Sequence, residues 1–126
     1  MSSYVLDASA ILALLNNEPG ADVVQSALTN SNCFMSVVNW SEVARKLVAR
    51  GLGVESVAQT LEGLGLEFKD FDYSQAVAAA LLEAPALSLG DRACLALAQS
   101  LEVVALTADQ IWQTFALGIT IELIRR

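Results

Sequence analysis

The residues Tyr4-Val5-Leu6-Asp7 form a short apolar run that ends in an acidic side chain and passes directly into a helical pattern. An acid also follows or interrupts three later apolar stretches: Val37-Val38-Asn39-Trp40-Ser41-Glu42, Leu87-Ser88-Leu89-Gly90-Asp91 and Val103-Val104-Ala105-Leu106-Thr107-Ala108-Asp109. Short apolar runs that alternate with helical patterns are typical of α/β folds. The sequence therefore predicts an α/β protein that places acidic residues at the junctions between strands and helices.

The alternation extends along the whole chain. Strands are predicted at residues 3–6, 32–36, 66–68, 103–106 and 119–123, and helices at residues 8–15, 19–28, 39–50, 54–64, 72–84, 89–101 and 109–115. In this interpretation Asn39 caps its helix, and Glu42 occupies the capping-box position three residues later. Pairs of helices between strands form long crossovers, which predict a mostly parallel sheet covered on both faces.

The composition is that of one domain spanning residues 1–126, with 55% hydrophobic and 17% charged residues. No apolar run reaches the roughly 18 residues of a membrane span, and no basic segment precedes the first apolar run as in a signal peptide. The two cysteines lie inside apolar stretches, which favours buried free thiols in a reducing compartment. We therefore expect a cytoplasmic protein with no membrane partner.

The charged residues exclude several kinds of site. Because the chain has no histidine, it cannot use histidine triads, histidine proton shuttles or histidine-containing zinc sites. A formal net charge of −7 argues against broad electrostatic binding of nucleic acid. A local basic patch remains available at Arg45, Lys46 and Arg50.

The four acids would converge if the first and fourth strands were neighbours. Ligands of open parallel sheets bind beyond the carboxyl ends of the strands, where Asp7 and Asp109 lie. Buried carboxylates cost free energy unless they are paired, and the seven Lys and Arg residues all follow Ser41. A hard divalent cation, Mg²⁺ or Mn²⁺, is the natural counter-charge for oxygen ligands. Without it, mutual repulsion should raise the pKa of at least one acid.

Each acid also has an ordinary structural explanation. Asp7 and Asp109 could cap the helices that follow them. Glu42 could pair with Lys46 on a solvated helix face, and Asp91 could be stabilised by the positive end of its own helix. Taken singly, none of these residues decides between function and structure.

Taken in order, the four acidic segments resemble those of PIN-domain ribonucleases, and within these the VapC toxins of prokaryotic toxin–antitoxin pairs. The likeness spans nearly the whole chain. It implies a three-layer α/β/α sandwich around a five-stranded sheet of order 3-2-1-4-5, in which the first and fourth strands are neighbours. It also implies a Mg²⁺- or Mn²⁺-dependent endoribonuclease that cleaves RNA, forms a homodimer and is inhibited by a small VapB-type antitoxin.

The resemblance assigns the catalytic and metal-binding positions to four acids: Asp7, Glu42, Asp91 and Asp109. It assigns accessory hydroxyl groups to Ser9 and Thr107, which would orient a carboxylate or a water molecule. Arg92, beside a catalytic acid, could reach a substrate phosphate or pair with a neighbour. Some relatives carry a further acid two residues after the last one, where this chain has Ile111, and this favours one metal site over two.

Two other functions are compatible with the same fold: a stand-alone PIN-domain RNA-processing nuclease, and a non-catalytic PIN-like module that binds proteins. A haloacid-dehalogenase-like phosphatase with Asp7 as nucleophile fits less well. Such enzymes need a second acid two residues later, where Ser9 stands, and a lysine beyond the middle of the chain, whereas Lys69 is the last lysine.

Overall fold

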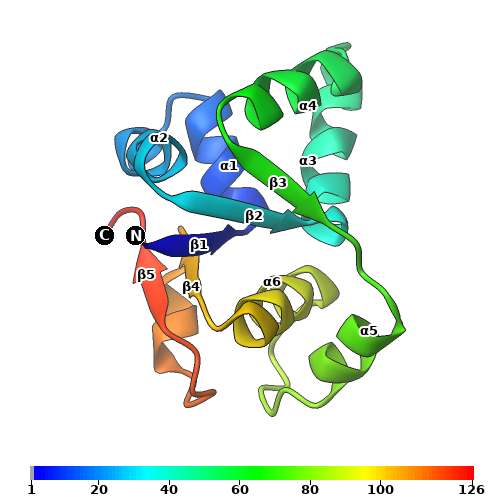
Figure 1. Ribbon diagram of the computed structural model, residues 1–126, viewed down its shortest axis with the longest axis vertical. Helices are drawn as coiled ribbons and strands as arrows, with labels where there is room; N and C mark the ends of the chain where they lie inside the picture. The colour runs from blue at the N-terminus through cyan, green and yellow to red at the C-terminus, as the bar shows by residue number, and fades with distance from the viewer. Residues whose placement is uncertain (1) are drawn as a thin grey trace.

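A computed structural model describes residues 2–126 and contains a five-stranded sheet of order β3-β2-β1-β4-β5 (Figure 1). The strands are β1 (Ser3–Leu6), β2 (Asn32–Ser36), β3 (Leu66–Lys69), β4 (Val104–Thr107) and β5 (Ile121–Leu123). All four strand pairings are parallel. The predicted sheet order is confirmed, and with it the adjacency of β1 and β4.

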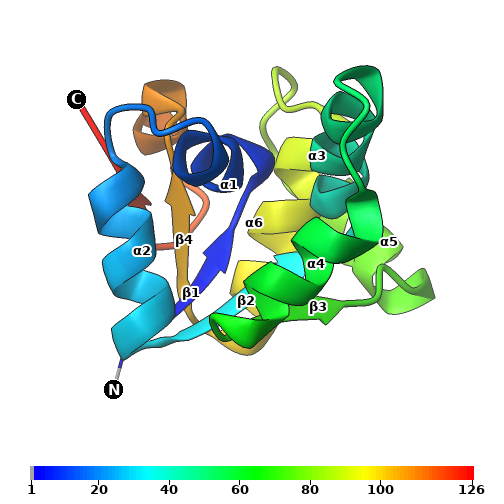
Figure 2. The same ribbon diagram turned by 90° about the horizontal axis from the view of Figure 1, so that it is seen from above.

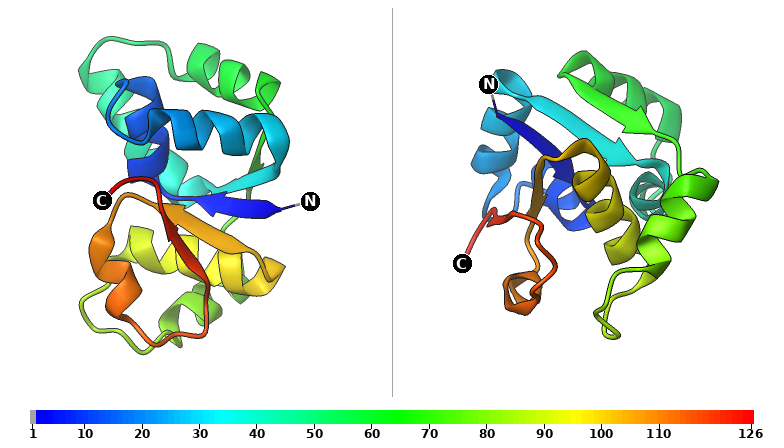
Figure 3. Two further views of the ribbon diagram at one scale, coloured as in Figure 1. Left: turned by 90° about the vertical axis from the view of Figure 1, so that its left-hand side faces the viewer. Right: turned by 60° about the horizontal axis from the view of Figure 1, so that its bottom comes forward.

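Helices cover both faces of the sheet, which confirms the α/β/α sandwich (Figure 1 and Figure 2). One face is covered by α1 (Ala8–Leu15), α2 (Ala21–Asn30), α3 (Val37–Ala49) and α4 (Val54–Gly63). The other face is covered by α5 (Tyr73–Ala80), α6 (Leu89–Leu101) and the 3-10 helix η1 (Gln110–Thr114). Helix α6 packs against β1, β2 and β4, as both views in Figure 3 show.

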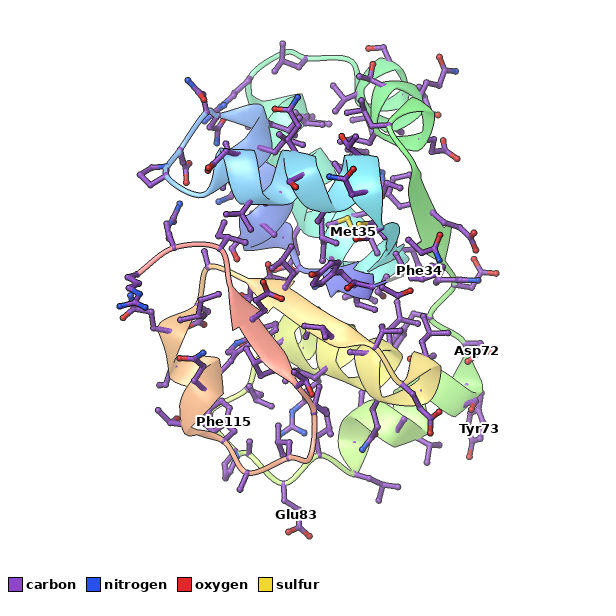
Figure 4. All side chains as sticks on the ribbon, turned by 60° about the vertical axis from the view of Figure 1, so that its left-hand side comes forward. Phe34, Met35, Asp72, Tyr73, Glu83 and Phe115 are labelled. Carbon is purple, nitrogen blue, oxygen red and sulfur yellow. The ribbon has the colours of Figure 1, made fainter. Side chains whose placement is uncertain are left out.

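Successive side chains of the central strands β1, β2 and β4 enter different hydrophobic cores, as the two-residue period of a strand requires. Met35 belongs to the core beneath α1–α4, whereas its neighbour Phe34 packs into the core beneath α5 and α6 (Figure 4). Each core also contains one buried free thiol, Cys33 in the first and Cys94 in the second. The prediction of buried free cysteines is confirmed.

The start of α3 differs from the prediction. The helix begins at Val37, and Ser36 caps it by accepting a hydrogen bond from the Val38 N–H at 3.2 Å. Asn39 is therefore not the cap, and Glu42 is not in a capping box. Both Ser36 and Asn39 are good capping residues. Ser36 takes this position because β2 passes into the helix without a loop, and Asn39 is buried instead.

Other boundaries differ by a few residues. Helix α2 begins at Ala21 rather than at residue 19, because Gly20 takes the left-handed conformation (φ +98°) at its cap. Helix α5 ends at Ala80 rather than at residue 84. The predicted helix at residues 89–101 is confirmed. Within residues 2–126, no helix is both long enough and apolar enough to span a membrane.

Candidate active site

Asp7 lies at the carboxyl end of β1, beside the carboxyl end of β4. The strand register pairs Leu6 with Leu106, and the Asp7 N–H donates to the Leu106 carbonyl at 3.3 Å. The Asp7 side chain also caps α1, because its Oδ1 accepts a hydrogen bond from the Ala10 N–H at 2.9 Å. The capping role and the position at the functional edge of the sheet therefore coexist in one residue.

Two hydroxyl groups orient the Asp7 carboxylate. The Ser9 hydroxyl donates to Oδ1 at 2.7 Å, and the Thr107 hydroxyl donates to Oδ2 at 2.6 Å. The two hydroxyl oxygens also accept hydrogen bonds from the loop after β4. The Ala108 N–H donates to Ser9 Oγ and the Asp109 N–H donates to Thr107 Oγ1, both at 3.0 Å. The structure thus places Ser9 and Thr107 in contact with Asp7 and ties the loop after β1 to the loop after β4.

The pKa of Asp7 is raised from 3.8 to about 6. Burial is the main cause, since only 6% of the residue is exposed. Hydrogen bonds from Thr107, Ser9 and Ala10 lower the pKa, and the negative charge of Asp91 raises it. Repulsion between acids therefore contributes as expected, but desolvation contributes more. The effect of Asp91 also places the two carboxylates in the same neighbourhood.

Glu42 lies against Gly90, the residue that precedes Asp91 in the first turn of α6. The Asn39 side-chain amide donates to the Gly90 carbonyl at 2.9 Å and to Glu42 Oε1 at 3.3 Å. Asp91 forms a capping box with Ser88: each side chain accepts a hydrogen bond from the other residue's backbone N–H at 3.1 Å. The first turns of α3 and α6 are thereby joined close to two of the four acids.

The negative charges of three of the four acids act on one buried thiol. Burial raises the pKa of Cys94 well above its ordinary value, and the charges of Asp7, Asp91 and Glu42 raise it further. Asp109 is joined to this group through the loop hydrogen bonds at Asp7. Its own side chain is exposed and accepts a hydrogen bond from the backbone N–H two residues later at 3.1 Å.

None of the four acids is neutralised by a basic side chain of residues 2–126. The ion pairs in this part of the chain are Lys69–Glu67 at 2.6 Å and Arg125–Glu18 at 3.2 Å. Asp7 therefore carries a buried charge that is compensated only by hydrogen bonds, an arrangement that a bound cation would stabilise.

Arg92 faces away from these acids. Its guanidinium donates to four backbone carbonyls at the end of α5 and in the following loop, at 2.8–3.4 Å: those of Ala79, Leu82, Ala84 and Leu87. The side chain holds the loop between α5 and α6 and pairs with no acid among residues 2–126, and these carbonyls use four of its five N–H donors. The structure thus gives Arg92 a structural role, and its contact with a substrate phosphate stays a prediction.

The donor atoms fit a hydrated Mg²⁺ or Mn²⁺ ion better than a closed metal cage. In the described part of the chain, no three His, Cys, Asp or Glu side chains are gathered closely enough to hold an ion directly. Mg²⁺ usually binds one or two carboxylates and keeps several waters. Asp7, held by two hydroxyl groups and lying near Asp91, supplies oxygen ligands of this kind.

An open cleft lies beside Glu42. Its volume is about 650 Å³, and it is lined by residues of α3 and the start of α6 together with Phe71. Glu42 supplies a negatively charged wall, whereas Val37 and Leu89 supply exposed apolar walls. Of the four acids, Glu42 alone lines this cleft.

Two residues next to Glu42 were not predicted to belong to the site. Asn39 was predicted only as a helix cap, and Gly90 was noted only as part of the segment that contains Asp91. Asn39 was detectable as a polar residue within an otherwise apolar run, and Gly90 as a poor helix former in the first turn of a strongly apolar helix.

Comparisons with known proteins agree with this arrangement. Residues 4–116 match the family described as PIN domain. The fold is similar to that of a toxin–antitoxin complex from Klebsiella pneumoniae (TM-score 0.76, 18% identity), with 93% of this chain and 95% of that chain covered. It is also similar to DNA-bound VapBC from Salmonella typhimurium (TM-score 0.72, 20% identity; 98% and 99% covered).

A third similar structure is VapBC-5 from Mycobacterium tuberculosis (TM-score 0.62, 24% identity), with the full length of both chains covered. Comparison with curated protein sequences gives no significant match. The match to the family covers most of the chain, and the strand order agrees with it. The chain therefore belongs to the PIN domain family.

Proposed function

We propose that this protein is an endoribonuclease that uses Mg²⁺ or Mn²⁺ and serves as the toxin of a VapBC-type toxin–antitoxin pair. The observation that carries the proposal is the buried Asp7 carboxylate, which has no basic partner among residues 2–126 and shares its surroundings with Glu42 and Asp91. Membership of the PIN domain family and the fold shared with VapBC complexes support it.

In this proposal Asp7, Glu42, Asp91 and Asp109 hold the cation, in part through water. When bound, the cation supplies electrophilic catalysis: it lowers the pKa of water and neutralises charge on the phosphodiester. Ser9 and Thr107 fix the orientation of the Asp7 oxygens, which reduces the reorganisation needed on binding. Since the pKa of Asp7 is about 6, the carboxylate is mostly ionised at neutral pH and becomes a poorer ligand below pH 6.

We further propose a VapB-type antitoxin as partner. An apolar groove of about 340 Å³ lies between α1, α2 and α4, with walls that include Leu14, Leu15 and Leu61. Grooves of this kind receive amphipathic helices, and the neighbouring acidic site would attract an Arg or Lys of such a segment. A short antitoxin that abolishes RNA cleavage when mixed with the purified protein would support this assignment, and unchanged cleavage would count against it.

We also propose a homodimer. Tyr73, Val77 and Leu81 follow one another at four-residue spacing along the exposed side of α5, at 85%, 40% and 73% exposure. An apolar stripe of this kind is usually covered in solution. Sedimentation equilibrium tests the proposal directly: a monomer at micromolar concentration would contradict it.

The nuclease proposal is tested with Asp7→Asn and a matched control, Asp72→Asn. Both residues cap a helix through the backbone N–H three residues later, at 2.9 Å in each case, but Asp72 lies exposed at the start of α5 (Figure 4) and is not one of the four acids of the site. We expect calorimetry to detect Mn²⁺ binding by the wild type and by Asp72→Asn, and both to cleave RNA. Asp7→Asn should lose both properties.

Three outcomes separate the alternatives. RNA cleavage that survives in Asp7→Asn would exclude this site. Mn²⁺ binding without cleavage of any RNA would favour a binding module, whereas cleavage that no antitoxin inhibits would favour a stand-alone RNA-processing nuclease.

A further inference from the structure

Gly90 occupies a position that no other residue could take without moving Glu42. A Cβ atom added at Gly90 would overlap Glu42 Oε1 and lie 2.9 Å from Cδ and 3.1 Å from Oε2. The three atoms nearest to that Cβ all belong to this one carboxyl group. The space left by the missing side chain is therefore filled by the Glu42 carboxylate rather than by helix backbone.

Asn39 donates a hydrogen bond to the same carboxylate. Its side chain is 1% exposed and donates both to the Gly90 carbonyl and to Glu42 Oε1. Its Oδ1 is buried and accepts no hydrogen bond from residues 2–126. An unpaired buried acceptor lowers stability. An apolar residue would avoid this cost, so the amide is better explained by its two donated hydrogen bonds.

We infer that Asn39 and Gly90 are positioning residues that hold the Glu42 carboxylate at the amino end of α6, next to the position of Asp91. Glu42 is otherwise an exposed residue of α3 whose flexible side chain could turn toward solvent. Held by the Asn39 amide against the bare Cα of Gly90, the carboxylate stays beside the first turn of α6, which contains Asp91. The role of this placement in catalysis rests on the proposed nuclease function. The contacts that hold Glu42 in place do not depend on that proposal.

The alternative explanation for Gly90 is close packing of α3 against α6. That explanation predicts backbone atoms near the added Cβ, but the nearest atoms are the end of a flexible side chain. A methyl group at Gly90 should therefore displace the carboxylate while leaving the two helices in place. Loss of Glu42 placement and loss of folding can thus be separated by experiment.

The test uses Gly90→Ala with Gly63→Ala as the matched control. Gly63 also lies in a helix, but nothing lies within 4 Å of its added Cβ. We expect Gly90→Ala to weaken Mn²⁺ binding about 10- to 100-fold, the usual effect of disturbing the groups that orient a metal ligand. Gly63→Ala should bind Mn²⁺ like the wild type. In the Glu42→Ala background, Gly90→Ala should weaken binding no further, because the displaced group is already absent.

Thermal unfolding in EDTA tests the placement of Glu42 against Gly90 without metal or RNA. Alanine is a better helix former than glycine. Gly90→Ala should therefore raise Tm in the Glu42→Ala background, and by at least about 2 °C more than in the wild type, where it must displace the carboxylate. Equal shifts of Tm in both backgrounds would overturn the inference. If Gly90→Ala shifts Tm differently in the two backgrounds but the wild type neither binds Mn²⁺ nor cleaves RNA, the placement of Glu42 is supported and the nuclease proposal is refuted.

Discussion

Replacing Asp7 with asparagine should stabilise the protein at neutral pH in the absence of metal. Burial raises the pKa of Asp7 from 3.8 to about 6, so the folded protein prefers the protonated carboxyl group. The difference between these two values corresponds to about 3 kcal/mol at 1.36 kcal/mol per pH unit. This destabilisation is absent below the unfolded pKa of 3.8, grows as the pH rises to about 6, and is constant above it.

The asparagine variant removes the charge and keeps most of the hydrogen bonds. Its amide oxygen can still accept from Ser9 and from the Ala10 N–H, and the Thr107 hydroxyl can turn to donate to Ser9 Oγ, 3.3 Å away. We therefore expect a gain of about 1–3 kcal/mol at pH 7.5, the lower figure allowing for imperfect replacement of a charge-assisted hydrogen bond.

Urea denaturation at pH 5.0 and pH 7.5, in EDTA, measures the effect. Between these pH values the free energy of unfolding of the wild type should fall by about 1.4 kcal/mol more than that of Asp7→Asn. Comparing the two proteins at each pH cancels the titration of the other groups. Asp72→Asn serves again as control and should follow the wild type. If the difference between wild type and Asp7→Asn is the same at both pH values, Asp7 does not have the raised pKa on which the argument depends.

Three further predictions follow from the same contacts. At a free Mn²⁺ concentration of 100 Kd, the wild type should gain about 2.7 kcal/mol in the free energy of unfolding. Asp7→Asn should gain little, so an equal rise in Tm for both proteins would contradict metal binding at Asp7. Thr107→Val should raise the pKa of Asp7 above about 6, because the lost hydrogen bond lowers it; NMR titration of the labelled carboxyl carbon reports this, and an unchanged midpoint would refute it. Arg92→Lys should cost about 1–3 kcal/mol in urea denaturation, because a single ammonium cannot reach all four backbone carbonyls. It should leave Mn²⁺ affinity unchanged, and a weaker affinity would indicate that Arg92 contributes to the metal site.

The alternation of apolar runs and helical patterns was sufficient to predict the strands, because helices cover both faces of the parallel sheet and its central strands are largely buried. It could not establish that β1 and β4 are neighbours, since no local property of residues 3–6 and 104–107 records their pairing. That expectation came from the order of the four acidic segments and their likeness to PIN-domain proteins. The hydrogen bond from the Thr107 hydroxyl to the Asp7 carboxylate depends on this long-range adjacency.

The errors at the site arose where two local explanations compete. Ser36 and Asn39 are both suitable helix caps, three residues apart, and local sequence does not choose between them. The position of the cap depends instead on a contact between residues 51 positions apart in the sequence, the hydrogen bond from the Asn39 side chain to the Gly90 carbonyl. The partners of Arg92 could not be predicted for a similar reason, because they are carbonyl oxygens of a loop whose path no sequence pattern describes.

The two buried thiols lie on opposite faces of the sheet. Their reactivity in the native protein can therefore report when the helices on either face move away from the sheet. Burial suppresses ionisation of Cys33 and Cys94, so a disulfide reagent such as Ellman's can react only while the surrounding layer is transiently exposed. The reaction rate of Cys33 therefore follows opening of the α1–α4 layer, and that of Cys94 follows opening of the α5–α6 layer. A ligand held by the acids would retard labelling of the second thiol more than the first, and no engineered probe is needed to observe it.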